Sequence, residues 1–184
     1  MRVSAESITA RLKIVEGERA RRAREPGLQA SASAVKHFQQ LRFMHTYADL
    51  LASERYGRAS RFFLDELYGP GDFTRRDAQF ARVVPALVRL FPSDVVDTVA
   101  ALAELHALSE TLDTGMAVAL LPSTTVDARS YIRIWQQTGR ASDRETQIVL
   151  TLDIAGRLDA LTRKPLLRQS LRLMRGPARA AGLG

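Results

Sequence analysis

Apolar side chains recur every three or four positions along almost the whole chain, and no stretch alternates apolar and polar residues between turn signals. A period of three to four residues marks one face of an α-helix, whereas a half-buried strand needs a period of two. Pro26-Gly27 and Gly139 are among the breakers that separate successive periodic segments. We therefore predict an all-α protein, a bundle of about six to eight helices.

The first predicted helix starts at Ser4 or Ser7 and runs to about Arg24. Ser142 to Glu145 has the pattern of a capping box, and the segment behind it is apolar nearly all round, which predicts a buried central helix. We expect Gly57 to end a long helix as a C-cap, and Pro85 to kink or split its own helix. Further helices are expected over about residues 31–56, 61–68, 74–91, 93–121, 124–137, 142–161 and 166–174.

The chain has 184 residues and no cysteine. That length suits one domain with an appendage, so we predict a charged N-terminal helix over residues 1–27 and a helical bundle over residues 28–184. Without cysteine there is no disulfide framework, no thiolate metal site and no cysteine nucleophile. The longest apolar run, residues 116–121, is far too short to span a membrane, and the N-terminus lacks an apolar signal region. We expect a soluble, cytoplasmic protein.

The run from Arg61 to Asp77 differs most from a generic amphipathic helix, because it places aromatic residues and charges of both signs around a Gly-Pro-Gly turn. One interpretation is a corner that binds a ligand or partner, with aromatic anchors and an arginine that can donate two hydrogen bonds. The other is a structural corner whose polar residues cap helix ends. The candidate residues are Tyr68, Asp72, Phe73, Arg76 and Asp77.

The net charge of +7 is concentrated near the C-terminus, since residues 157–184 contain seven basic residues and one acidic residue. If this segment is helical, four basic side chains form a stripe beside apolar ones, which is typical of a helix that binds anions. The segment has no aromatic residue, which argues against base stacking. A docked helix with a solvated basic face is the other interpretation. The anion-binding candidates are Lys164, Arg168, Arg172 and Arg175.

Catalytic and metal-binding patterns are not found in the sequence. No Glu-x-x-His pair occurs, and the three histidines, His37, His45 and His106, do not have the spacing of metal ligands. We therefore predict no metal site, no catalytic residue and no cofactor. Haem needs only one axial histidine, so a haem-binding or small-ligand-binding bundle that uses His45 or His106 stays as an alternative.

The run Phe62-Phe63-Leu64-x-x-Leu67-Tyr68-Gly69-Pro70-x-Asp72-Phe73-x-x-Arg76-Asp77 resembles the signature of an uncharacterised family of bacterial helical proteins. Residues 131–135, 144–148 and 174–178 resemble the same family, so the likeness covers about residues 35–184. The family has no known activity, and the resemblance therefore implies no site residues.

Together these observations favour a non-enzymatic module that acts through protein–protein contacts, with a partner protein or a second copy of itself. Nucleic-acid or anion binding through the C-terminal segment is the first alternative, and the haem-binding or small-ligand-binding bundle is the second.

Overall fold

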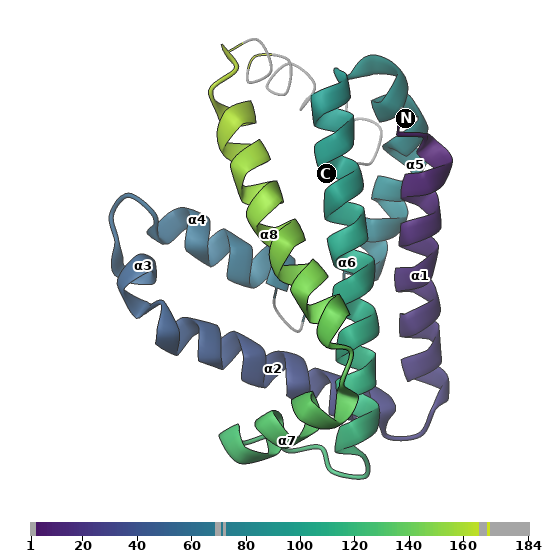
Figure 1. The fold of residues 1–184 in the computed structure, drawn as a ribbon, viewed down its shortest axis with the longest axis vertical. Helices are drawn as coiled ribbons and strands as arrows, with labels where there is room; N and C mark the ends of the chain where they lie inside the picture. The colour runs from purple at the N-terminus through teal and green to yellow at the C-terminus, as the bar shows by residue number, and fades with distance from the viewer. Residues whose placement is uncertain (1–2, 69–70, 72, 166–168, 170–184) are drawn as a thin grey trace. The chain divides into compact units, whose positions relative to one another are not determined.

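The computed structural model describes residues 3–68, 71, 73–165 and 169, without the side chains of residues 66–68. These residues form eight α-helices and one π-helix, and none of them is in a β-strand, which confirms the all-α prediction (Figure 1). The elements are α1 (Ala5–Arg24), α2 (Leu28–Thr46), α3 (Ala48–Ala52), α4 (Gly57–Phe62), η1 (the π-helix, Phe63–Tyr68), α5 (Thr74–Leu90), α6 (Ser93–Leu120), α7 (Ala128–Thr138) and α8 (Ala141–Thr162).

The chain divides into two compact units, and α1 and α6 each contribute residues to both. Unit 1 contains residues 1–16, 74–109 and 140–184, and unit 2 contains residues 17–73 and 110–139. The domain boundary that we predicted at residue 27 stays a prediction.

Unit 1 has a core of small and branched apolar side chains. Ile8 and Leu12 from α1 pack against Val84 from α5 and against Val96 and Ala103 from α6. Figure 1 shows α8 running beside α6, and the amide of Gln147 on α8 donates a hydrogen bond of 2.8 Å to the hydroxyl of Ser109 on α6. Ile154 is the buried residue of α8. The hydrogen bond of Gln147 and the burial of Ile154 show which face of α8 is turned inward.

Unit 2 is built around the C-terminal part of α6. Val35 of α2, Met116 of α6 and Ile134 of α7 are fully buried together, and Tyr131 of α7 stacks on Phe38 of α2 with ring centroids 4.8 Å apart. A second cluster joins α2 to α6 and contains Leu28, Ala32 and Ala117. Three helices thus share one apolar centre in this unit.

The prediction of one long helix over residues 31–56 is wrong. The observed helix, α2, begins earlier, at Leu28, and ends at Thr46, because the backbone of Tyr47 leaves the helical region with φ −116° and ψ 36°. Gly57 starts α4 and does not end a helix. A Cβ on Gly57 would lie 2.8 Å from the backbone oxygen of Leu51, so glycine serves a close approach of two backbone segments there.

Two predictions for the region after Gly139 are also wrong. Gly139 and Arg140 both have positive φ, of 62° and 60°, so the turn is completed early and α8 begins at Ala141, one residue before the predicted cap. The helix is not buried all round. Ile148, Val149 and Leu152 are 62%, 59% and 69% exposed, because only one face of α8 packs inside unit 1.

Smaller differences concern α5 and α7. Pro85 lies inside α5, which continues to Leu90 without being split. Helix α7 starts at Ala128, later than predicted, because Asp127 and Ser130 form the capping box there with hydrogen bonds of 2.7 and 2.9 Å. The helix predicted over residues 166–174 lies outside the described residues.

Candidate functional site

A buried ion cluster joins three helices of unit 2. The carboxylate of Glu110 on α6 accepts hydrogen bonds from Arg22 of α1 at 2.6 Å and from Lys36 of α2 at 2.8 Å, and Arg19 of α1 lies 3.5 Å away. Both Arg22 and Glu110 are about 4% exposed in their side chains. We call Arg19, Arg22, Lys36 and Glu110 the Glu110 cluster.

The electrostatics of this cluster keep Glu110 ionised. Burial alone raises the pKa of its carboxyl, but the charges and hydrogen bonds of Lys36 and Arg22 outweigh burial and lower that pKa to about 2. Arg22 also donates a hydrogen bond of 2.9 Å to Thr114, while its Nε atom is buried without a hydrogen-bond partner. A permanently charged, saturated carboxylate is suited to holding helices together and unsuited to proton transfer.

The Glu110 cluster was missed by the sequence reasoning, although the sequence contains a signal for it. The apolar positions Ile8, Leu12 and Val15 of the first helix continue at the same spacing into Arg19 and Arg22. Charged residues that continue an apolar stripe indicate a buried ionic contact, because such residues are rarely buried unless they are paired.

A second feature of unit 2 is a group of exposed aromatic side chains. The Phe43 ring on α2 contacts both Tyr47, with centroids 4.6 Å apart, and Phe63 of η1, with centroids 5.6 Å apart. Tyr47 and Phe63 are nevertheless 43% and 39% exposed, and Met44 and Phe62, which are adjacent in the chain to Phe43 and Phe63, are 45% and 58% exposed. We call Phe43, Met44, Tyr47, Phe62 and Phe63 the aromatic surface.

The aromatic surface is carried by an unusual backbone. Residues 63–68 form a π-helix directly after α4, and η1 contacts both α4 and α2. The amide of Gln40 on α2 donates a weak hydrogen bond of 3.4 Å to the backbone oxygen of Leu64. Turns of π-helix are rare and occur frequently at functional sites. The aromatic run that stood out in the sequence therefore forms a distinctive local structure.

The predicted corner from Tyr68 to Asp77 falls across the division between the two units. Phe73 belongs to unit 2, whereas Arg76 and Asp77 are in the first turn of α5 in unit 1. Asp72 and the side chain of Tyr68 lie outside the described part of the chain. Whether this corner is a site or a structural turn stays a prediction.

Asp77 has a partner that the sequence reasoning did not assign. Its carboxylate lies 2.9 Å from Nε2 of His106 on α6, and its other oxygen lies 3.3 Å from Nε of Arg76. Asp77 and His106 have side chains 16% and 26% exposed. The pair links α5 to α6 inside unit 1, which is compatible with the structural interpretation of this part of the corner.

Of the four anion-binding candidates, Lys164 is described, and Arg168, Arg172 and Arg175 lie outside the described residues. Lys164 donates a hydrogen bond to the carboxylate of Asp94 in the first turn of α6. This bond lowers the pKa of Asp94 and keeps it charged. Anion binding by this segment stays a prediction.

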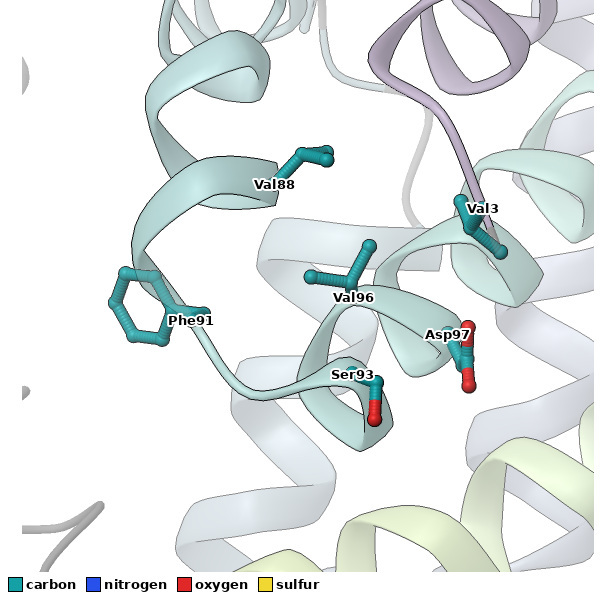
Figure 2. Close-up of a pocket in the computed structure, with 6 residues that line it drawn as sticks. All are labelled: Val3, Val88, Phe91, Ser93, Val96 and Asp97. Carbon is teal, nitrogen blue, oxygen red and sulfur yellow. The ribbon is translucent and has the colours of Figure 1, made fainter.

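A small hollow in unit 1 and the metal-binding side chains of the described residues were the other candidate features. Figure 2 shows a hollow in unit 1 between the ends of α5 and α6, lined by residues such as Val88, Phe91 and Asp97. Its volume is about 10 Å³, enough for roughly one water molecule. No three histidine, aspartate or glutamate side chains lie together as a metal would need, within the described residues. Haem ligation by His45 or His106 stays a prediction.

A transmembrane helix needs about 20 predominantly apolar residues. Within residues 3–68, 71, 73–165 and 169, no helix is both long enough and apolar enough to cross a bilayer.

The helical units, the buried ion cluster and the exposed aromatic surface define an all-α protein assembled from two compact units. Residues 18–184 match the model of a family described as Domain of unknown function (DUF8198). The chain therefore belongs to this family. No curated protein and no solved structure matches the chain.

Proposed function

We propose that this chain is a non-enzymatic interaction module, and that a partner protein binds it through the aromatic surface of unit 2. The observation that carries this proposal is the exposure of Tyr47, Phe62 and Phe63 around a π-helix. Phenylalanine, tyrosine and methionine are enriched in the buried centres of protein interfaces, where a few aromatic anchors supply most of the binding energy.

The energetics favour covering this surface. Aromatic side chains bury about 150–250 Å² each, and apolar area removed from water stabilises by about 25 cal/mol per Å². Phe62 is 58% exposed and Tyr47 is 43% exposed, so a partner would gain about 3 kcal/mol from covering Phe62 and about 2 kcal/mol from covering Tyr47 on that basis. The contact of Phe43 with Tyr47 and Phe63 holds two of these rings in place before a partner arrives.

The Glu110 cluster also supports the proposal, because its chemistry suits a structural role and does not suit acid–base catalysis. Its carboxylate is occupied by Arg22 and Lys36, and its lowered pKa removes it from the range of a general base or acid. We assign to it the role of fixing α1, α2 and α6, and hence of holding the helix that carries Phe43 and Tyr47.

A site-specific photo-cross-linking experiment tests the proposal. A photoreactive phenylalanine analogue replaces Phe62 in one sample and Ile132 of α7 in the other, and both proteins are irradiated in the cells that naturally produce them. The two positions are matched, since both lie in unit 2 and are 58% and 57% exposed. We expect a discrete adduct with one protein from position 62 and none from position 132.

A second variant separates binding from folding. Tyr47→Ser should abolish the adduct from position 62 and lower the thermal unfolding temperature only modestly, because the side chain is 43% exposed and the substitution removes its ring contact with Phe43. Equal labelling from positions 62 and 132, or an adduct that survives Tyr47→Ser, would overturn the proposal.

A further inference from the structure

The outward face of α8 in unit 1 is apolar along its middle. Ile148, Val149 and Leu152 are each more than half exposed, whereas Ile154 on the opposite side of the helix is buried. Three large branched side chains next to one another are more than the isolated exposed apolar residues that ordinary surfaces carry. A surface of this kind is expected where another protein surface covers it.

Gly156 lies beside this apolar stretch and has no packing role within its own unit. A Cβ built on Gly156 would meet no other atom within 4 Å. Glycine inside a helix is destabilising relative to alanine, because it loses more conformational freedom on folding. A glycine that is not needed for internal packing leaves a hollow in the helix surface that a side chain from outside can enter.

Four residues of α8 and its C-cap lie on one line along this face. Glu145 precedes Leu152 by two turns, and Arg163 follows Gly156 by two turns, so the four residues fall within about 40° around the helix axis. All four are exposed. Along this line the helix therefore presents, in chain order, an acidic side chain, a large apolar side chain, a glycine without a side chain and a basic side chain.

This order of side chains is complementary to the same order on a second copy of α8 that runs in the opposite direction. In an antiparallel pair, Leu152 of each copy faces Gly156 of the other, and the same register puts Glu145 of each copy beside Arg163 of the other. A parallel pair would instead set Glu145 against Glu145 and Arg163 against Arg163, which is unfavourable. Arg163 already binds Asp159 at 2.6 Å, and its guanidinium has further N–H groups for a second carboxylate.

We propose that two copies of this chain form a two-fold symmetric dimer through α8, antiparallel, with Leu152 of each copy seated on Gly156 of the other. Such an interface is isologous, since the same patch serves both copies. One pair of helices buries less than the roughly 800 Å² per partner of a standard interface, so we expect a dissociation constant on the order of 10 µM. The proposal concerns unit 1 and does not depend on the aromatic surface of unit 2.

Sedimentation equilibrium of the full chain between about 1 and 500 µM brackets the expected dissociation constant and measures it directly. The wild type should change from monomer to dimer across this range. Leu152→Gln should weaken the dimer by about tenfold or more, because it replaces the central apolar contact. A wild type that is monomeric throughout would overturn the proposal, including the case in which a different protein covers α8.

Gly156→Gln tests the hollow, with Gly17→Gln as its matched control. Both glycines are helical, and a Cβ at either would meet nothing within 4 Å, so both variants should fold and melt at a slightly higher temperature. Only Gly156→Gln should weaken the dimer, by about tenfold or more, since its side chain fills the space for Leu152. Equal dimerisation of the two variants would refute the predicted register.

Charge exchange tests the antiparallel direction. Glu145→Arg and Arg163→Glu should each weaken the dimer by a few fold, and the double variant should restore it, because the pair is then reversed and still complementary. A double variant that is as weak as the two single variants would exclude the antiparallel arrangement.

Discussion

Replacing Glu110 by glutamine provides the most direct test of how unit 2 is held together. Glutamine keeps the shape of the side chain but removes the negative charge that faces Arg22 and Lys36 at 2.6 and 2.8 Å. Arg22 is 4% exposed, so its positive charge would remain buried without compensation. Removing one partner of a buried ion pair typically costs about 3–5 kcal/mol.

The pKa of Glu110 gives an independent magnitude. It lies at about 2 in the folded protein, against 4.5 for an unperturbed glutamate. At about 1.4 kcal/mol for each pKa unit, the folded state favours the ionised carboxyl by about 3 kcal/mol. The two routes agree, and we expect Glu110→Gln to lower the free energy of unfolding by about 3 kcal/mol.

The same pKa predicts the dependence on pH. Because folding lowers the pKa, the contribution of Glu110 is fully present above pH 4.5 and is lost as the pH falls toward 2. The wild type should therefore lose about 3 kcal/mol more than Glu110→Gln over this interval. Both proteins should share the acid sensitivity of their other carboxyl groups.

Urea unfolding followed by circular dichroism measures these differences, and Glu25→Gln is the matched control. Glu25, the residue directly after α1, binds Arg21 of that helix at 2.8 Å, but this pair is about 45% exposed, and exposed pairs contribute under about 1 kcal/mol. If Glu110→Gln costs less than about 1 kcal/mol, or no more than Glu25→Gln, the reasoning about the Glu110 cluster is refuted.

Two further substitutions test the packing of unit 2. Ile134→Ala should cost about 2–5 kcal/mol in urea unfolding, because Ile134 is fully buried against α2 and α6; a cost below 1 kcal/mol would show that α7 is loosely packed. Gly27→Ala should cost about 1–2 kcal/mol, because Gly27 has φ 76° and a Cβ there would lie 3.3 Å from Leu121; an unchanged urea midpoint would contradict that geometry.

Local signals in the sequence predicted most of the helices. The three-to-four-residue period of Ile8, Leu12 and Val15 gave the first helix, and the stop at Pro26-Gly27 agrees with the left-handed conformation of Gly27. Such signals depend only on residues close in the chain, and local rules of backbone conformation are therefore sufficient to read them.

The features that were not predicted depend on contacts between distant segments. Tyr47 carries no breaker signal, and its departure from the helix accompanies ring contacts that link α2 to η1. Helix α8 is apolar on several faces, so its pattern could not tell which face is covered, and the hydrogen bond of Gln147 to Ser109 and the burial of Ile154 decide this. The pairing of Asp77 with His106 likewise joins residues 29 positions apart.

The Glu110 cluster also limits how sequences of this family can change. Arg22, Lys36 and Glu110 come from three different helices. The negative charge of Glu110 is balanced by the positive charges of Arg22 and Lys36, so losing one partner leaves the charge of another without its counterpart. A substitution at one position is costly until another compensates it, whereas joint replacement by apolar residues of similar volume can be neutral. We therefore expect positions 22, 36 and 110 to vary together in related chains, so that a neutral residue at position 110 is found with neutral residues at the other two.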